Sequence, residues 1–494
     1  MGVPKVLGIE TEYGVVLRGT TDPNPVLASS MLINAYVEHR KVGWDFDDET
    51  PGRDARGFAR DGAEPPEVET HLVNTVLTNG ARYYVDHAHP EYSAPECSNA
   101  REVVVADKAG ERILARSMQA ARRILPESQE IVVYKNNSDG KGNSYGCHEN
   151  YLLDRATPFG SIVRHMLPWF TTRQIFCGAG KVGAENGNQL TGFQITQRAD
   201  FFEEEVGLET TLKRPIVNTR DEPHADPQKY RRLHVIVGDA NLCELSTYLK
   251  VGTTAIVLSM VEDDFIDKDL SLAAPVAAIR AISHDPTLRT TVEMADGSQV
   301  SALELQWEFL GMAQKYAEDV GLDTCGGEIG LDVLSRWEQV LTDLEADPFR
   351  LDGKLDWVTK LSLLDAYRSR DGLEWGDPKL ALLDLQYHDG RPDRSLYEKL
   401  VRAGKIERLL DEAEVLAATS EPPATTRAYF RGECLARWPE AVVAANWDSI
   451  ILDVGSDPLR RIPMMEPLRG TKEFVGPLLD ECDTPADLVT RLAG

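Results

Sequence analysis

Residues 80–92 read GARYYVDHAHPEY, and this stretch predicts the centre of the fold. Residues 81–86 carry the aromatic and β-branched side chains of a β-strand. Successive side chains of a strand point to opposite faces, so Arg82, Tyr84 and Asp86 share one face. Asp86 ends the strand before a turn that contains His87 and His89. That position suits a nucleophile or a general base, although an aspartate there also commonly caps a turn.

Four further predicted strands, at residues 3–13, 145–152, 191–198 and 231–238, carry polar side chains at alternate positions. A sheet face turned to solvent is usually covered by Lys, Thr, Ser and Glu. These stripes instead contain His, Arg, Asn and single acids beside Gly and aromatic residues, which favours a functional cavity. The aligned side chains are Glu10 with Glu12, His148 with Asn150, Gln194 and Thr196 with Arg198, and Arg232 with His234.

The acids and imidazoles of these strands suggest a magnesium site. Hard divalent cations prefer carboxylate oxygens, and two such ions commonly clamp nucleotide phosphates. Zinc is a poor alternative, because no residues of the sequence have the spacing that zinc ligands show. Taken alone, two carboxylates such as Glu10 and Glu12 on one strand more often mark a solvent-exposed edge strand. The full candidate set is Glu10, Glu12, Glu91, Glu96, His148 and His234.

Four arginines are candidates for binding phosphate or carboxylate groups, because a guanidinium offers a two-pronged hydrogen-bond donor. Any single one of them is more often a surface salt bridge. They are Arg82, Arg198, Arg220 and Arg431.

Strands are concentrated early in the chain and helices late, which predicts the α+β class. The Pro-containing segment 419–426 suggests a boundary between a large domain, residues 1–420, and a small C-terminal domain, residues 421–494. Residues 43–69 are rich in Asp, Glu, Gly and Pro and predict a long mobile loop. A further strand is expected at 130–135, and helices at 26–40, 109–125, 244–262, 302–319, 329–345, 354–368 and 394–417.

Composition narrows the class of protein. The chain has 494 residues and a formal net charge of −27, which disfavours non-specific binding to nucleic acid or to anionic membranes. Its 7 cysteines form no CxxC pair, so a disulfide framework is not expected and the cytosol is the natural compartment. The N-terminus lacks the pattern of a signal peptide, and no run is long enough for a membrane helix.

Six segments follow one another along the chain: GIETEYG (8–14), GARYYVDHAHPEY (80–92), YGCHENY (145–151), NTRDEPHAD (218–226), YRRLHVIVGDANLCE (230–244) and TRAYFRGE (426–433). Together they resemble the Pup ligase/depupylase family, in which they occur in the same order. The resemblance covers nearly the whole chain. It implies an N-terminal domain similar to that of glutamine synthetase, with an antiparallel sheet forming the active-site cradle and helices behind it.

The family has two branches, and this chain resembles the hydrolytic one. One branch ligates the C-terminal glutamate side chain of the protein tag Pup to substrate lysines. The other cleaves that isopeptide bond and deamidates a C-terminal glutamine of Pup. After Asp86 the segment DHAHPEY is similar to the hydrolases, whereas ligases tend to carry one residue more and a glycine. The insertion at 43–69 is also typical of the hydrolases.

The resemblance implies roles for individual residues, with ATP and Mg²⁺ as cofactors. Asp86 would be the catalytic residue. Tryptophan at position 447 and alanine at position 94, where the family has a threonine near the nucleotide, would lie at the ATP site. The remaining implied residues are Glu10, Tyr84 and Glu91 as magnesium ligands, His148 and His234 at a second metal or at phosphate, Arg82 at ATP, and Arg198, Arg220 and Arg431 at phosphate or the bound side chain.

Pup and pupylated proteins are the implied partners of a monomeric enzyme. Because the resemblance implies an acidic, disordered Pup that folds on binding, a basic patch is expected beside the site. Three other activities compete with this interpretation: a Pup–protein ligase, a small-molecule glutamate–amine ligase, and a non-enzymatic ATP-binding regulator that holds Pup. Candidates for the patch are Arg112, Arg116, Arg122 and Arg123.

Overall fold

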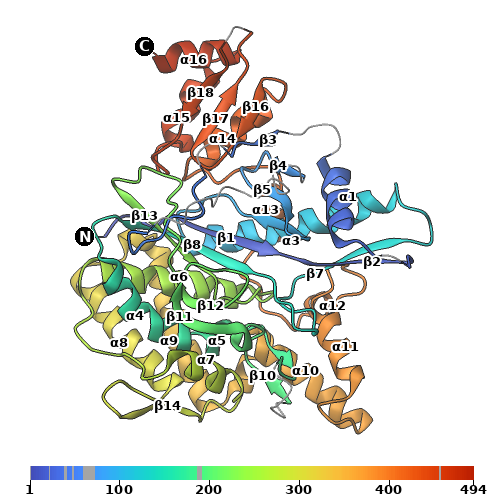
Figure 1. Cartoon of the computed structure of the whole chain (residues 1–494), viewed down its shortest axis with the longest axis vertical. Helices are drawn as coiled ribbons and strands as arrows, with labels where there is room; N and C mark the ends of the chain where they lie inside the picture. Colours follow the sequence, from blue (N-terminus) through green and yellow to red (C-terminus); the bar gives the residue numbers. More distant parts are fainter. Residues whose placement is uncertain are drawn as a thin grey trace.

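The computed structural model describes residues 2–21, 23–37, 42–46, 49–58, 73–185, 192–455 and 458–493. Its centre is a six-stranded sheet in the order β13-β8-β1-β6-β5-β4, whose neighbouring strands run antiparallel. The sheet crosses the middle of the molecule (Figure 1). Its strands are β1 (Leu7–Glu12), β4 (Asn74–Val76), β5 (Arg82–Asp86), β6 (His89–Ser93), β8 (Cys147–Asp154) and β13 (Tyr230–Val235).

One face of this sheet is buried against helices. In β1, Leu7, Ile9 and Thr11 are buried, while Glu10 and Glu12 lie on the opposite face. Removing the apolar side chains from water is the main favourable contribution to folding here. Nearly every side chain of the central helix α6 is buried, which explains its apolar sequence without an amphipathic stripe. The covering helices are α1 (Pro25–Val37), α3 (Ala100–Arg122) and α6 (Glu244–Glu262).

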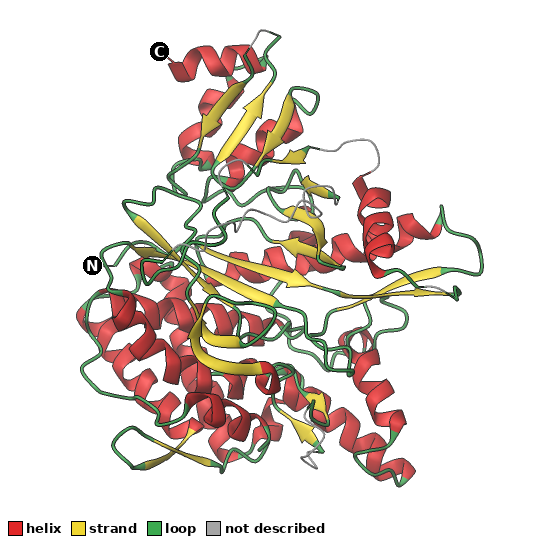
Figure 2. Cartoon of the chain, viewed as in Figure 1, coloured by secondary structure: helices red, strands yellow, loops and turns green. Residues whose placement is uncertain are grey.

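More helices extend the covering layer below the sheet, as Figures 1 and 2 show. They share one continuous apolar core with the sheet. Trp169 is at its centre, with its ring 5.3 Å from that of Trp337 and 5.1 Å from that of Phe309. These helices are α4 (Phe159–Thr172), α5 (Gln174–Cys177), α7 (Pro275–Ser283), α8 (Ala302–Asp319), α9 (Glu328–Ala346), α10 (Asp356–Asp371), α11 (Pro378–Tyr387) and α12 (Leu396–Arg402), with 3₁₀ turns η1 (Ala199–Phe201), η2 (Asp323–Cys325) and η3 (Pro348–Leu351). The short helix α13 (Glu412–Ala417) packs on α3 instead.

Two-stranded ribbons surround the central sheet. The pair β2–β7 is antiparallel, and β11–β12 is parallel. The second of these carries the chain from Arg198 toward the segment 218–224, which borders the open face of the sheet. The strands are β2 (Gly14–Arg18), β7 (Glu130–Tyr134), β9 (Lys181–Val182), β10 (Phe193–Gln194), β11 (Phe202–Gly207), β12 (Arg214–Asn218), β14 (Thr291–Glu293) and β15 (Gln299–Ser301).

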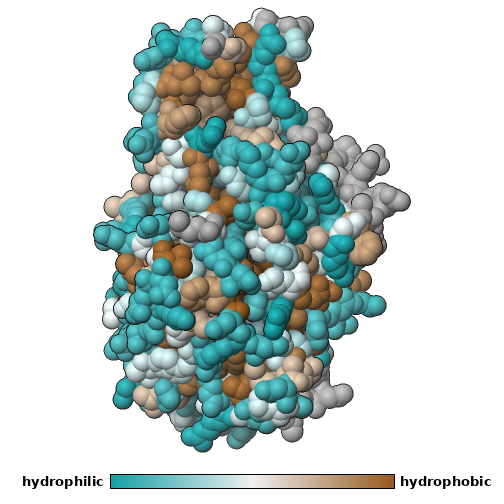
Figure 3. Space-filling view, turned by 90° about the vertical axis from the view of Figure 1, so that its left-hand side faces the viewer, coloured by the Kyte–Doolittle hydropathy of each residue, from teal (hydrophilic) through white to brown (hydrophobic). Residues whose placement is uncertain are grey.

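The C-terminal part has an apolar core of its own, built on a sheet of order β18-β17-β16-β3. Residues from early in the chain join this core, among them Trp44 and Val76. Figure 3 shows apolar side chains gathered on one face of this part. Whether it is a separate domain from residue 421 onward stays a prediction. Its elements are β3 (Gly43–Trp44), β16 (Val442–Ala445), β17 (Ser449–Leu452), β18 (Arg460–Pro463), α14 (Ala428–Arg437), α15 (Lys472–Asp480) and α16 (Pro485–Ala493).

The α+β class is confirmed, and the helices predicted at 244–262 and 302–319 match α6 and α8. The prediction of a single helix over 394–417 was wrong. The helix α12 ends before Gly404, whose φ of 66° suits a helix terminus. The helix predicted from residue 109 begins at Ala100 instead. There, the Asn99 side chain accepts a hydrogen bond from the Glu102 backbone N–H and caps the helix.

Two other expectations need correction. The strand predicted at 191–198 is regular only at Phe193 and Gln194. Within the predicted loop 43–69, residues 43 and 44 form β3, and the Ala55 N–H donates to the Thr219 carbonyl at 2.8 Å. Residues 47–48 and 59–69 of that loop lie outside the described residues. Across the described ranges, no helix has both the length and the apolar character needed to cross a membrane.

Candidate active site

The open face of the central sheet borders a cavity of about 310 Å³. Two further groups of residues and the side chain of Trp447 complete its walls: Phe46, Glu49 and Pro51, and Thr210, Thr211, Arg220, Glu222 and His224. Most of the residues predicted from the sequence meet here. Those on the central sheet do so because their strands are neighbours and alternation places them on the same face, whereas Arg220 and Trp447 come from outside this sheet. These residues are Glu10, Arg82, Tyr84, Asp86, Glu91, His148, Arg220, His234 and Trp447.

Strand register explains why acids and histidines cluster. Glu91 pairs with Glu12 on one side and with Tyr84 on the other. Glu10 lies opposite His148 of β8. Directly opposed side chains in an antiparallel sheet have Cβ atoms about 5 Å apart. Three strands therefore bring one group of acids together, and the adjoining strands add the two imidazoles.

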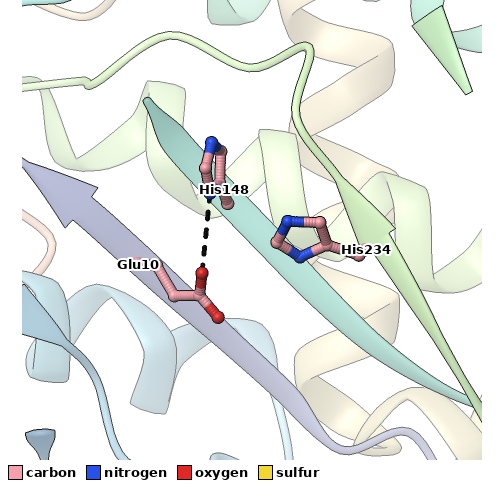
Figure 4. Close-up of side chains that lie close together, drawn as sticks. All are labelled: Glu10, His148 and His234. Atoms are coloured by element: carbon pink, nitrogen blue, oxygen red, sulfur yellow. Dashed lines mark ion pairs between the residues drawn. The ribbon is translucent and has the colours of Figure 1, made fainter. Parts of the chain in front are cut away.

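The first group consists of Glu10, His148 and His234, which Figure 4 shows converging from three strands. The Nδ1 atom of His148 lies 3.5 Å from a Glu10 carboxylate oxygen, and the two imidazole rings are 4.9 Å apart. Burial and the nearby Arg232 lower the pKa of His234 well below its usual value, so its imidazole is neutral. A neutral imidazole is the form that ligates metals.

Asn150 orients this first group. Its side-chain nitrogen donates to Glu10 at 2.8 Å, and its side-chain oxygen lies 3.0 Å from His234 Nδ1. In the tautomer whose Nδ1 donates to that oxygen, the lone pair of His234 is on Nε2. A histidine that binds a metal through one ring nitrogen usually donates a hydrogen bond from the other nitrogen in this way. The geometry fits a divalent cation held by these three side chains.

The second group consists of Glu12, Asp86 and Glu91. Burial, and then the charges of Asp86, Glu12 and Glu10, raise the pKa of Glu91 well above its usual value. Crowded carboxylates of this kind repel one another unless a cation lies among them. The oxygen donors match the preference of Mg²⁺. The set therefore fits a hard divalent cation.

Asp86 is at the tip of the β5–β6 hairpin, where it pairs with His89 across a two-residue turn. The turn gives His87 a φ of 50°, which is uncommon for any residue other than glycine. The His87 Nδ1 atom lies 2.8 Å from an Asp86 carboxylate oxygen. The turn thus places an imidazole directly against the predicted catalytic carboxylate.

A second, larger cavity of about 720 Å³ adjoins the first. The two share Asp86, His87 and His148, so the predicted catalytic carboxylate lies where they meet. Arg198 and Arg214 line only this second cavity. Burial, followed by the charge of Arg214, lowers the pKa of Arg198 to about 10. Two cations this close favour an anionic group between them.

Ala94 and Arg431 lie outside the main cavity. Ala94 lines a smaller, mainly apolar cavity of about 80 Å³ together with Trp447. Arg431 is fully buried, and its guanidinium donates to Glu96, to the Gly80 carbonyl and to the Trp447 carbonyl. A role for Arg431 at the nucleotide stays a prediction.

Two groupings made from the sequence are corrected by these contacts. Glu96 does not join the acid cluster. It binds Arg427 at 2.7 Å and also Arg431, because its backbone follows β6 toward the C-terminal core. The four arginines named for a basic patch belong to α3 or to its C-terminal cap and line neither cavity. Arg112 pairs with Glu412 at 2.7 Å and Arg116 donates to Thr419, on the helix that covers the buried face of the sheet.

A family model described as Pup-ligase protein matches residues 5–451. The chain belongs to this family.

Its relatives match over nearly their full lengths. A depupylase of Acidothermus cellulolyticus is 56% identical over 99% of both chains. A Pup deamidase/depupylase of Mycobacterium tuberculosis is 49% identical, again over 99% of both. A Pup–protein ligase of Acidimicrobium ferrooxidans is 39% identical over 96% of this chain and 98% of its own.

Solved structures of the Pup-ligase family share the fold. A ligase in complex with Pup matches with a TM-score of 0.81 and 34% identity, over 97% of this chain and 92% of that one. A Pup ligase in complex with ADP matches with a TM-score of 0.75 and 38% identity, over 82% and 89%.

Several residues of this site were given no role from the sequence. Arg232 was aligned with His234 on one strand face, two residues away, but was not assigned to the site. Its guanidinium is 2.6 Å from the Asn150 side-chain oxygen. Glu49 and Glu222 line the cavity from irregular segments, where no periodicity indicates the direction of a side chain. Arg214 is on β12, a strand that was not expected.

Proposed function

We propose that this chain is a depupylase and Pup deamidase. It hydrolyses the isopeptide bond between the C-terminal side chain of Pup and a substrate lysine, and it converts a C-terminal glutamine of Pup to glutamate. The observation that carries the proposal is the pattern of identities. Relatives named for hydrolysis are 49–56% identical over the whole chain, whereas ligases are 39–40% identical.

The reaction is hydrolysis of an unactivated amide, and the junction of the two cavities supports it. Asp86 lies there beside His87 and acts either as the nucleophile that attacks the amide carbon or as the base that activates water. The larger cavity has room for the C-terminal residue of Pup. Arg198 and Arg214, which line this cavity, can pair with the carboxylates of that residue. Trapping an acyl-enzyme at Asp86 in a rapid quench identifies the nucleophile. The absence of an acyl-enzyme would count against attack by Asp86.

ATP is the proposed nucleotide, in line with the ADP-bound ligase that shares this fold. The apolar cavity beside Ala94 and Trp447 suits a purine base. Arg82 and Arg220 line the neighbouring cavity, where the phosphates would lie. The role of Arg431 in this proposal is indirect, since it supports the Trp447 carbonyl and lies 5.1 Å from its ring.

Mg²⁺ is the proposed metal, held by the two acid and imidazole groups. When bound, it neutralises phosphate charge and stabilises the oxyanion that develops on the amide. Tyr84 is a neighbour of Glu91 rather than an obvious ligand, because burial and Glu91 raise the pKa of its hydroxyl well above the usual value. We further propose a monomeric, cytoplasmic enzyme whose partners are Pup and pupylated proteins.

A gel assay on a purified Pup–protein conjugate with ATP and Mg²⁺ tests this function. Wild type should release free Pup, and chelation of Mg²⁺ with EDTA should stop the release. Replacing a catalytic acid or base typically lowers the rate by about 10²–10⁴-fold, so Asp86→Asn should do the same. The matched control is Asp393→Asn, which changes an exposed carboxylate on the surface.

If the chain were a Pup–protein ligase, the same gel assay would give the reverse result. A wild-type chain that leaves the conjugate intact, but joins Pup ending in glutamate to a test protein, would be a Pup–protein ligase. Equal loss of activity in Asp86→Asn and Asp393→Asn would remove Asp86 from the mechanism while leaving the hydrolase in place.

A further inference from the structure

Arg82 lies between two aromatic rings that come from different sheets. Its guanidinium carbon is 3.9 Å from the centre of the Tyr84 ring and 4.0 Å from that of Trp44. Tyr84 belongs to the central sheet, two residues from Arg82 on β5. Trp44 belongs to β3, at the edge of the C-terminal sheet. The stacked arginine therefore joins the two sheets at the wall of the cavity.

The position of Trp44 is set by its own contacts. Its strand runs parallel to β16, with Trp44 opposite Ala445. The indole N–H donates to a Glu49 carboxylate oxygen at 2.6 Å, and the ring meets that of Trp447 edge-on at 5.2 Å. Only 7% of Trp44 is exposed. An aromatic side chain held on several sides gives a rigid surface for the guanidinium.

The outer end of Arg82 has one charged neighbour among the described residues, Glu49. The Nε atom of Arg82 donates to the Asn74 side-chain oxygen at 3.0 Å, and Glu49 lies 3.9 Å from Nη1. Among the described residues, neither terminal nitrogen of Arg82 makes a hydrogen bond, although both belong to a side chain that lines the cavity. Arg431 differs, because its terminal nitrogens are occupied by Glu96 and by backbone carbonyls.

We propose that Trp44 is a positioning residue for the nucleotide: it fixes the guanidinium of Arg82 so that its terminal nitrogens face the phosphates. This inference rests on the proposed function and adds a residue that contacts no ligand itself. A stacked guanidinium loses less freedom when it binds an anion, since the planar group is already oriented. Trp44 also belongs to the C-terminal core. If its role were only to stabilise that core, its replacement would not specifically weaken nucleotide binding.

Binding of Mg·ADP to the full-length protein, measured by calorimetry, separates the two roles. A cation–π contact is worth about 0.5–2 kcal/mol, so Trp44→Leu should raise the Kd for ADP by roughly 3- to 30-fold. Trp44→Phe keeps an aromatic ring and should retain most of the affinity. The control is Trp438→Leu, which removes an indole that packs against the same core away from Arg82.

A double-mutant cycle with Arg82→Lys makes the test independent of folding. Lysine lacks the planar fork, so Trp44→Leu should add little to the Kd once Arg82 is replaced. The proposal is overturned if Trp44→Leu binds ADP like wild type, if Trp438→Leu weakens binding equally, or if the two substitutions at 44 and 82 act additively. A wild type that cleaves no conjugate and binds no ADP would refute the proposed function as well.

Discussion

At the scale of single residues, the site separates two kinds of arginine by what surrounds them. Arg220 lines the cavity that holds the acid and imidazole groups. Arg198 lines the second cavity, where burial and the charge of Arg214 lower its pKa. Both cavities include Asp86 in their walls. The arrangement suits an enzyme that holds nucleotide on one side of the catalytic carboxylate and its protein substrate on the other.

Exchanging each arginine for methionine should therefore affect different constants. A hydrogen bond to a charged group contributes about 1.5–3 kcal/mol, so Arg198→Met should raise the KM for the Pup conjugate by roughly 10- to 100-fold. The Kd for ADP should stay within about twofold, because additivity holds for separated sites. Arg220→Met should show the opposite pattern. Steady-state kinetics and calorimetry check both, and a shared loss of ADP affinity would show that the cavities are not divided in this way.

At the scale of elements, the helix α3 packs closely on β6 through a glycine. A Cβ atom added at Gly110 would lie 2.5 Å from the buried ring of Tyr92. That ring cannot move aside easily, because Asn79 donates a hydrogen bond to its hydroxyl at 3.0 Å. Gly311, on the exposed side of α8, has nothing within 4 Å of the same added atom. The two glycines have the same helical backbone but opposite surroundings.

Alanine at these two positions should change stability in opposite directions. Overpacking a core costs about 1–3 kcal/mol, so Gly110→Ala should lower the free energy of unfolding despite its better helix propensity. Gly311→Ala gains about 0.5–1 kcal/mol, since alanine loses less backbone entropy than glycine. Urea midpoints of the two variants decide the matter. A stabilised Gly110→Ala would mean that the contact between α3 and β6 is looser than the structure has it.

Regular elements are also where the sequence was most informative. Alternation along strands placed Glu10, His148 and His234 on one face, and the structure brings them together. Arg198 was assigned to a strand, but it lies in an irregular segment, so its direction could not follow from a period of two. Trp44 and Glu49 were part of a segment without periodicity. The position of Trp44 depends on pairing with Ala445, about 400 positions later in the chain, and Glu49 is held by the Trp44 indole; local pattern contains no such information.

At the scale of the whole molecule, Glu96 connects the two apolar cores. It leaves β6 of the central sheet and binds Arg427 at 2.7 Å and Arg431, which belong to the C-terminal part. Burial alone would raise the pKa of Glu96, but the charges and hydrogen bonds of these two arginines lower it to about 2. The relative position of the cores, and with it the place of Trp447 over the cavity, therefore depends on an ionised carboxylate.

A carboxyl whose pKa is lower in the folded state stabilises the protein above its ordinary pKa and loses this contribution as the pH falls through the folded value. The lowering from 4.5 to about 2 corresponds to on the order of 3 kcal/mol. Glu96→Gln should therefore be less stable than wild type at pH 7, and the difference should shrink between pH 4.5 and pH 2. Urea midpoints across this range measure it. The control is Glu414→Gln, which removes a half-exposed partner of Arg101 and should cost under about 1 kcal/mol at any pH. A deficit of Glu96→Gln that persists unchanged at pH 2 would show that the carboxylate acts through shape rather than charge.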